Sequence, residues 1–491
     1  MRRLGFLLLL LPALAAADVR LPSLIGDHML VQRDQPIRLW GWAEPGEQVS
    51  AAMAGHSSQA VTGPDGRWRV DLMPLPAGGP HKLEIQGKNK ITVDDVLVGE
   101  VWVGSGQSNM GFQVRNAIHA DKEIASATDG QIRLFQVKLE TAFTPKDDVT
   151  GEWMVCSPKT IPTFTAVGYF FARHLRQKLN IPVGVIQSAW GGTPAEAWTP
   201  RETLDNDDEL HAFLERWNRQ MEAYPRTKVR FDGQLAKWEA SKQGPRPREP
   251  AGPGHQHQPT VLYNAMIAPL TPYAIGGAIW YQGENNASRG QGYEYEHLMR
   301  SMIEAWRQKW GVGDFPFLFV QLANYARVSD TAQWPELREA QTHTLRTVNT
   351  GMAVTIDIGE SQDIHPKNKQ DVGLRLGLAA RAIAYGEHDL VYSGPIYRET
   401  SVEPGKLRLW FDHVGSGLMA KGPLEGFQVA GGDGRFHAAE AKIDGENIVV
   451  WSEHVKTPVA ARYAWADDPK APLYNKEGLP ASPFRTDDWR D

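Results

Sequence analysis

The chain has 491 residues, of which 42% are hydrophobic and 22% charged, with a formal net charge of −6. This is the composition of a globular protein long enough for two or three domains. Acidic and basic residues are interspersed along the chain, which argues against nucleic acid and against a membrane surface as partners. The single cysteine, Cys156, excludes an intramolecular disulfide, and we expect it to be a buried structural thiol.

Residues 1–17 have the pattern of a secretory signal peptide. Arg2 and Arg3 precede a short apolar run, and three alanines at residues 15–17 form a small-residue cleavage site. Neither this run nor any later one is long enough to span a membrane. We therefore expect export to the periplasm or the extracellular space. Cleavage after Ala17 removes two positive charges and changes the net charge from −6 to −8.

Short alternating runs separated by turn signals such as Gly63-Pro-Asp-Gly66 fill residues 18–95. This pattern predicts an N-terminal all-β domain of sandwich type. The same pattern of short alternating runs and turn signals returns after Ser393 and predicts a second all-β domain over residues 393–491.

Between them, residues 96–392 alternate apolar strands with helical patterns, which is typical of parallel βαβ units in an α/β domain. We predict strands at 97–103, 183–187, 276–281, 315–321 and 352–357. We predict helices at 167–178, 293–309, 335–346 and 369–385. Residues 200–259 form an insert, with a charged helical segment followed by a Pro- and Gly-rich excursion.

A serine stands where the first of these strands must turn, in Val101-Trp-Val-Gly-Ser-Gly-Gln-Ser-Asn-Met110. A buried strand that ends in a glycine-rich turn leaves backbone N–H groups free and lets a hydroxyl face a cleft. Ser108 is therefore a candidate nucleophile, although such serines more often cap a helix. Met110 occupies the place of the second glycine in the Gly-x-Ser-x-Gly elbow, so the motif is a different one.

Polar clusters follow three later strands. Gly191 and Gly192 offer free amides to an oxyanion, and Asn285 or Asn286 could add a side-chain donor. His365 follows the fifth predicted strand in Asp363-Ile-His-Pro366, which suits a general base oriented by a nearby acid. Ligands of open α/β sheets bind at the carboxyl ends of the strands, so these groups are expected to meet.

Other chemistries have weaker support in the sequence. His119 and the pair His255-Gln-His257 lack a carboxylate or cysteine at zinc-ligand spacing, so no metal site is predicted. Gly104-Ser-Gly106 lacks the third glycine of a dinucleotide-binding fingerprint.

Four ordered blocks closely resemble the sialate O-acetylesterase family, a branch of the SGNH hydrolases. They are Gly106-Gln-Ser-Asn-Met110, Ser188-Ala-Trp-Gly-Gly-Thr193 with Glu196-Ala-Trp198, Trp280-Tyr-Gln-Gly-Glu284 with Asn286, and Asp363-Ile-His-Pro366. The resemblance implies a flavodoxin-like three-layer α/β/α domain flanked by β regions, and hydrolysis of acetyl esters on sugars without a metal or organic cofactor.

The resemblance also implies residue roles. Ser108 is the expected nucleophile, His365 the base and Asp363 the orienting acid, with Glu360 as the substitute, because the superfamily's usual acid position holds Gln362. The expected oxyanion donors are the Ser108 amide, a glycine amide from Gly191–Gly192 and the side chain of Asn286, with Asn285 as the alternative. Substrate contacts are expected from Gln107, Trp190, Trp198 and Glu284.

We therefore expect a serine esterase that acts on an O-acetylated carbohydrate, most closely a sialate O-acetylesterase. An alternative is a deacetylase of plant polysaccharide, such as acetylated xylan or xyloglucan. A non-catalytic carbohydrate-binding protein is a rival of a different class. A glycosidase that uses Glu284 is weaker, because no second carboxylate is placed at the required separation.

Overall fold

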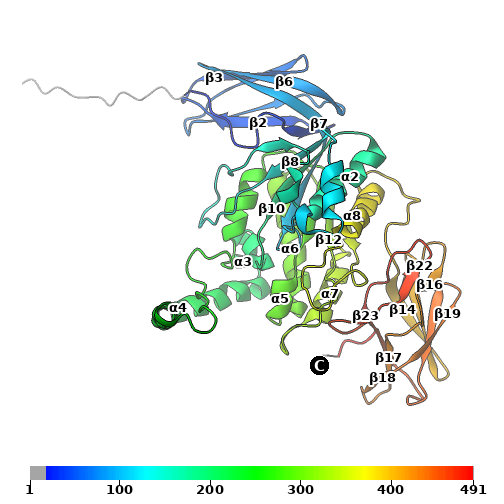
Figure 1. Ribbon diagram of the computed structural model, residues 1–491. Helices are drawn as coiled ribbons and strands as arrows, with labels where there is room; N and C mark the ends of the chain where they lie inside the picture. The colour runs from blue at the N-terminus through cyan, green and yellow to red at the C-terminus, as the bar shows by residue number, and fades with distance from the viewer. Residues whose placement is uncertain (1–17, 490–491) are drawn as a thin grey trace, which may run out of the picture.

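The computed structural model describes residues 18–489 and places a central α/β layer between two all-β regions (Figure 1). The central sheet runs in the order β13-β12-β11-β7-β10-β8-β9, with parallel neighbours except for the antiparallel edge strand β9. Its strands are β7 (Lys90–Gly106), β8 (Ile132–Gln136), β9 (Trp153–Val155), β10 (Val183–Ala189), β11 (Gly277–Tyr281), β12 (Phe317–Val320) and β13 (Thr350–Ala353).

The five predicted strands correspond to β7, β10, β11, β12 and β13. In the sheet these five strands lie side by side in the order β10-β7-β11-β12-β13. Numbered along the chain, this is the order 2-1-3-4-5 that is typical of flavodoxin-like sheets. The predicted α/β fold class is therefore confirmed. The sequence pattern did not predict β8, because Arg133 interrupts its apolar run. This arginine is buried and pairs with Asp95 at 2.7 Å.

Helices cover both faces of this sheet (Figure 1). On one face, α2 (Ala166–Leu179) packs beside α8 (Lys369–Ile383), and Trp102 of β7 lies in their core. On the other face lie α6 (Gly292–Trp310) and α7 (Trp334–Thr344), with Val101 and Val103 in that core. All four helices agree with the predicted ranges to within two residues at each end. Successive side chains of β7 point to opposite faces of the sheet because a strand has a period of two residues.

The N-terminal region is joined to the central sheet through β7 itself. Residues 90–98 of this strand pair with β6 antiparallel, whereas residues 100–106 pair with β10 in parallel. The boundary expected between residues 95 and 96 thus falls inside one continuous strand. The other strands are β1 (Leu30–Gln32), β2 (Ile37–Trp42), β3 (Gln48–Met53), β4 (His56–Val61), β5 (Arg67–Leu72) and β6 (Gly78–Gln86).

The C-terminal region is built from short antiparallel strands around a core of its own. One sheet has the order β14-β15-β20-β19, a second has the order β18-β17-β21-β23, and β16 pairs with β22. The strands are β14 (Ile396–Glu403), β15 (Lys406–Asp412), β16 (Leu418–Ala420), β17 (Phe427–Ala430), β18 (Phe436–Ala438), β19 (Glu440–Asp444), β20 (Asn447–Trp451), β21 (Ala460–Tyr463), β22 (Leu473–Asn475) and β23 (Phe484–Arg485).

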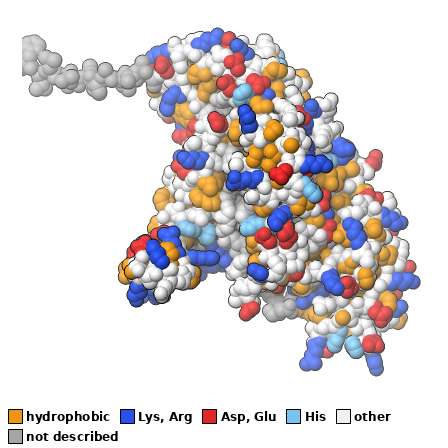
Figure 2. All heavy atoms as spheres, viewed as in Figure 1, with side chains coloured by type: hydrophobic (Ala, Val, Ile, Leu, Met, Phe, Trp, Pro, Cys, Tyr) orange, Lys and Arg blue, Asp and Glu red, His pale blue; other side chains and the backbone are white. Residues whose placement is uncertain are grey.

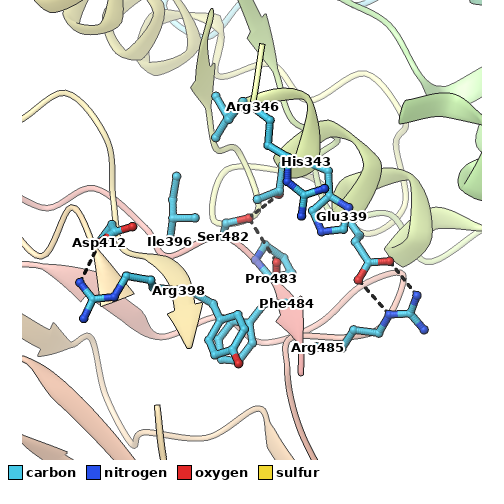
Figure 3. A pocket seen from close by; sticks show the side chains of 13 residues that line it. Glu339, His343, Arg346, Ile396, Arg398, Asp412, Ser482, Pro483, Phe484 and Arg485 are labelled. Carbon is cyan, nitrogen blue, oxygen red and sulfur yellow. Dashed lines mark hydrogen bonds and ion pairs between the residues drawn. The ribbon is translucent and has the colours of Figure 1, made fainter. Parts of the chain in front are cut away.

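A cavity of about 420 Å³ lies where this region meets α7 (Figure 3). Arg485 forms a two-pronged ion pair with Glu339 of α7 at 2.8 Å, and Arg398 pairs with Asp412 at 3.1 Å. None of the predicted site residues lines this cavity, and its charged side chains are held in pairs. The cavity therefore belongs to the junction between the two regions.

The insert contains α3 (Arg201–Asp205) and the long α4 (Asp208–Ser241), and α1 (Ala120–Ser126) and α5 (Glu284–Ser288) are the remaining α-helices of the described part. Asp207 caps the start of α4, and its carboxylate accepts hydrogen bonds from two amides of the first turn. It projects from the body as an arm, and a hollow separates the two (Figures 1 and 2).

Within residues 18–489, no helix has the length and apolar character needed to cross a membrane. The predicted signal peptide, residues 1–17, lies outside the described residues.

Candidate active site

Strand β7 ends in a turn whose backbone requires glycine. Gly106 has φ +132°, and a Cβ atom there would lie 2.2 Å from the Tyr281 carbonyl oxygen of the neighbouring strand β11. The Gln107 amide donates to that same oxygen at 2.9 Å and fixes the start of the turn. Ser108 follows and is partly exposed, while Ser105 inside the strand is fully buried.

The glycine pair after β10 lies directly against this turn. Ala189 at the end of β10 is in register with Gly106, and a Cβ atom at Gly191 would lie 3.3 Å from the Ser108 Cβ. Within residues 18–489, the backbone N–H groups of Ser108, Gly191 and Gly192 donate to no protein group. The two strand ends thus bring unused amide donors beside a hydroxyl, as an oxyanion site requires.

A hydrogen bond joins the Ser108 turn to the loop that carries His365. The Asn109 side-chain amide donates to the backbone carbonyl of Ile364 at 2.9 Å. Asn109 directly follows Ser108 and Ile364 directly precedes His365, so the nucleophile and base candidates lie on adjoining loops. The predicted meeting of these blocks at one edge of the sheet agrees with this arrangement.

Asp363 is the carboxylate that faces His365. Its Oδ1 lies 3.6 Å from His365 Nδ1 and accepts a hydrogen bond from the His365 backbone amide at 2.9 Å. The alternative acid, Glu360, instead accepts from the Lys367 amide at 2.8 Å. A separation of 3.6 Å is longer than a hydrogen bond, so the two side chains lie at ion-pair distance and not at hydrogen-bond distance.

Burial lowers the pKa of His365 below its ordinary value, and the Lys369 ammonium lowers it further while the Asp363 carboxylate opposes the shift. The imidazole is consequently neutral near pH 7, which is the form that can accept a proton from a hydroxyl.

Asn286 is fully buried and its side chain is occupied by four hydrogen bonds. Its Oδ1 accepts from the Ala195 amide at 3.0 Å and from Gln282 at 2.7 Å. Its Nδ2 donates to Glu196 at 2.9 Å and to Gln291 at 3.0 Å. No N–H group remains for an oxyanion, so the expected role of Asn286 is corrected to a structural one.

Asn285 is partly exposed instead. Its Nδ2 donates one hydrogen bond, to the Gly192 carbonyl at 2.7 Å, so one N–H of the amide is left over. Its backbone amide donates to Gln107 at 3.3 Å. The side chain therefore bridges the third block to the glycine pair.

Three of the expected substrate contacts are buried. Trp198 is fully buried, donates to Thr193 at 2.9 Å and packs edge-on against Trp280, so it belongs to the core. Glu284 is 3% exposed, hydrogen-bonds to Asn109 and has a raised pKa because of its burial. Gln107 is likewise 3% exposed. Only Trp190 of the four keeps a partly exposed surface. Cys156 is buried, as expected, and burial raises its pKa to about 12.

Sequence reasoning missed several residues around the site. Lys369, fully buried at the start of α8, donates to Asn109 Oδ1 at 2.6 Å. His257, at the end of the insert, contacts the Gly192 backbone and accepts from Arg289 at 3.0 Å. The sequence offered one weak signal for Lys369. A lysine in the first turn of a helix is unfavourable because it opposes the helix dipole, so a lysine at the start of α8 calls for another role.

Residues 249–384 match the family described as carbohydrate esterase, sialic acid-specific acetylesterase. The sialate O-acetylesterase of Rattus norvegicus is 34% identical over 441 residues, covering 80% of each chain. That of Mus musculus is 31% identical over 522 residues, covering 96% of this chain and 94% of the relative.

Among solved structures, a carbohydrate acetylesterase from Xanthomonas citri superimposes with a TM-score of 0.84 at 40% identity, covering 96% of this chain and 100% of the other. The family resemblance carried by the four sequence blocks is therefore confirmed. With its strand order, its glycine-lined serine turn and near-full-length similarity to these relatives, the chain belongs to the sialate O-acetylesterase family of carbohydrate esterases.

Proposed function

We propose that this protein is a carbohydrate O-acetylesterase that works through Ser108, His365 and Asp363. The observation that carries the proposal is the 2.9 Å hydrogen bond from Asn109 to the Ile364 carbonyl, which joins the serine turn to the histidine loop. A partly exposed serine, a neutral imidazole and unused amides at one strand edge are the groups that acyl transfer needs.

The reaction follows from these groups. His365 takes the proton of Ser108 as its Oγ attacks the acetyl carbonyl carbon, and the tetrahedral oxyanion accepts hydrogen bonds from the Ser108 and Gly191–Gly192 amides. Collapse of the intermediate breaks the ester bond, and His365 returns the proton to the leaving sugar oxygen. Water, deprotonated by His365, then attacks the acetyl-serine, and acetate leaves as the serine is restored.

Asn285 is the proposed side-chain donor of the oxyanion site. Its remaining N–H and its bond to the Gly192 carbonyl support this role. Asp363 orients the imidazole and stabilises its charged form.

An acidic sugar is the proposed substrate class. Arg289 extends from the end of α5, its side chain is 37% exposed, and Glu196 and His257 hold its guanidinium beside the Gly192 turn. Two of its five N–H groups are engaged, so the others can bind a carboxylate such as that of a sialic acid. A neutral acetylated polysaccharide of the xylan or xyloglucan type would not use this cation.

The first test is Ser108→Ala, measured by acetate release from p-nitrophenyl acetate. We expect loss of hydrolysis with the thermal unfolding curve unchanged. Ser105→Ala is the matched control, because this serine is buried three residues earlier and its hydroxyl has no hydrogen-bond partner among residues 18–489. Full activity of the Ser108 variant would refute the mechanism and leave a carbohydrate-binding protein as the better reading.

The second test compares acetate release from acetylated sialic acid and acetylated xyloglucan. Arg289→Gln should lower kcat/KM about tenfold or more on the sialic acid substrate and leave p-nitrophenyl acetate unaffected, because a lost charge-assisted pair costs about 1.5–3 kcal/mol. A preference of the unaltered enzyme for xyloglucan, with no effect of Arg289→Gln, would contradict the proposed substrate class.

Export is a further proposal and rests on the pattern of residues 1–17. N-terminal sequencing of the protein recovered outside the cytoplasm should begin at Asp18. Recovery with Met1 intact in the cytoplasm would contradict it.

A further inference from the structure

A buried cluster of charged and polar side chains lies beneath the candidate site and has no part in the reaction steps. It consists of Lys369 of α8, Glu284 of α5 and Asn109 of the serine turn. Asn109 Nδ2 donates to Glu284 Oε1 at 2.5 Å, and Lys369 Nζ donates to Asn109 Oδ1 at 2.6 Å. Burying a lysine and a glutamate is costly, so a fold that keeps both has to gain something from them.

The cluster determines which way the Asn109 amide points. The ammonium form of Lys369 only donates, and so it requires the oxygen of Asn109 on its side. The Nδ2 group must then face the opposite direction, where Glu284 Oε1 and the Ile364 carbonyl both accept. If the amide were reversed, two oxygens would face the Asn109 oxygen. Lys369 thus fixes the hydrogen bond that ties the Ser108 turn to the His365 loop.

Lys369 also acts on His365 through space. It follows His365 by four residues, and its ammonium lowers the pKa of the imidazole. The groups that face Lys369 are the carboxylates of Glu284, Glu360 and Asp363, together with the rings of Phe112 and Tyr281 at 4.9 and 5.1 Å from its Nζ. Burial lowers the pKa of Lys369 to about 7, and the three carboxylates oppose that shift.

We propose that Lys369, Asn109 and Glu284 form a positioning unit of the esterase, which locks the serine turn to the histidine loop. The unit does not touch substrate and takes no part in bond making. It rests on the proposed function, because its effect is exerted on the Ser108 and His365 assigned there. It also assigns a purpose to Glu284, which is too buried to bind a sugar.

Lys369→Met is the central test, with p-nitrophenyl acetate as substrate. We expect kcat to fall about 10- to 100-fold with little change in KM, since a misplacement near 1 Å can cost about 100-fold. The acid limb of the kcat/KM profile should move to higher pH, because a charge that lowers the His365 pKa is gone. A purely structural role would not move this limb. Lys369→Arg should restore its position at least in part.

Lys367→Met is the matched control. It removes the same charge two residues earlier, from an exposed side chain. We expect its kcat and pH profile to stay near those of the unaltered enzyme. If the acid limb moved equally in Lys367→Met and Lys369→Met, the change would follow from the lost net charge alone. That result would overturn the positioning role of Lys369.

Asn109→Asp is the second variant, because it keeps the shape but presents an acceptor to Glu284 and Ile364. It should lose at least tenfold in kcat while remaining folded. Unaltered kcat in this variant, or unfolding of both Asn109→Asp and Lys369→Met, would overturn the proposal. Failure of the proposed function shows separately, as activity that survives Ser108→Ala.

Discussion

The two adjacent asparagines after β11 give the sharpest test of the site, because we propose opposite tasks for them. Asn285→Ala removes a side chain that donates one bond to Gly192 and whose second N–H is the proposed donor to the oxyanion. Loss of one oxyanion donor typically costs about 100- to 1000-fold in kcat, or about 2.7–4 kcal/mol. We expect such a loss with the fold intact.

Asn286→Ala should act on stability instead. Its truncation leaves Ala195, Gln282, Glu196 and Gln291 without their shared partner in a buried place. Each unsatisfied buried group costs about 1–3 kcal/mol, and water entering the space recovers part of this. The expected loss in the free energy of unfolding is therefore about 3–5 kcal/mol.

Two measurements on each variant separate the tasks: kcat on p-nitrophenyl acetate at low temperature, and the midpoint of urea denaturation. The expected pattern is a damaged kcat with an unchanged midpoint for Asn285→Ala, and a lowered midpoint for Asn286→Ala. The opposite pattern would refute this assignment: Asn286→Ala would be stable with a hundredfold lower kcat, and Asn285→Ala would be fully active. Asn286 would then be the oxyanion donor, as the sequence led us to expect.

Two further predictions concern titrating groups. Asp363→Asn should lower kcat about 10- to 100-fold, less than the ~10,000-fold known for a buried triad acid, because Asp363 is solvent-accessible. It should move the acid limb to lower pH, since the Asp363 charge raises the His365 pKa; a larger effect of Glu360→Gln would identify Glu360 as the acid. Burial lowers the pKa of His174 to about 4 from 6.5, so the unfolded chain takes up a proton below pH 6.5 while the folded one does not. Stability present above pH 6.5 should fall by about 1–2 kcal/mol towards pH 4, after discounting for partial exposure, and His174→Gln should remove this loss in urea titrations. An unchanged pH dependence in His174→Gln would contradict this.

The shared strand β7 explains how the serine turn is held. Its first half belongs to the N-terminal sheet and its second half is the middle strand of the central sheet, so both regions anchor Ser108. Parallel neighbours on both sides exclude water from Val101 to Gly106. A nucleophile at the end of such a strand loses little freedom when substrate binds.

The sequence by itself determined the α/β class, the five main strands and the four covering helices, since hydrophobic periodicity and turn residues are local signals. It also identified the serine, histidine and glycine blocks, because the motif residues lie close together along the chain. It missed β8, where the charge of Arg133 is neutralised only by the distant Asp95.

Only the tertiary structure decided which polar residue of each block is buried and which stays partly exposed. Asn285 and Asn286 differ by one position, yet Asn285 is partly exposed, whereas Asn286 is buried and accepts a hydrogen bond from the distant Ala195. Trp198 and Glu284 look like sugar contacts in the chain, but neighbouring elements bury both. The physical reason is that burial and hydrogen-bond partners are set by contacts between segments far apart in sequence, which no local pattern encodes.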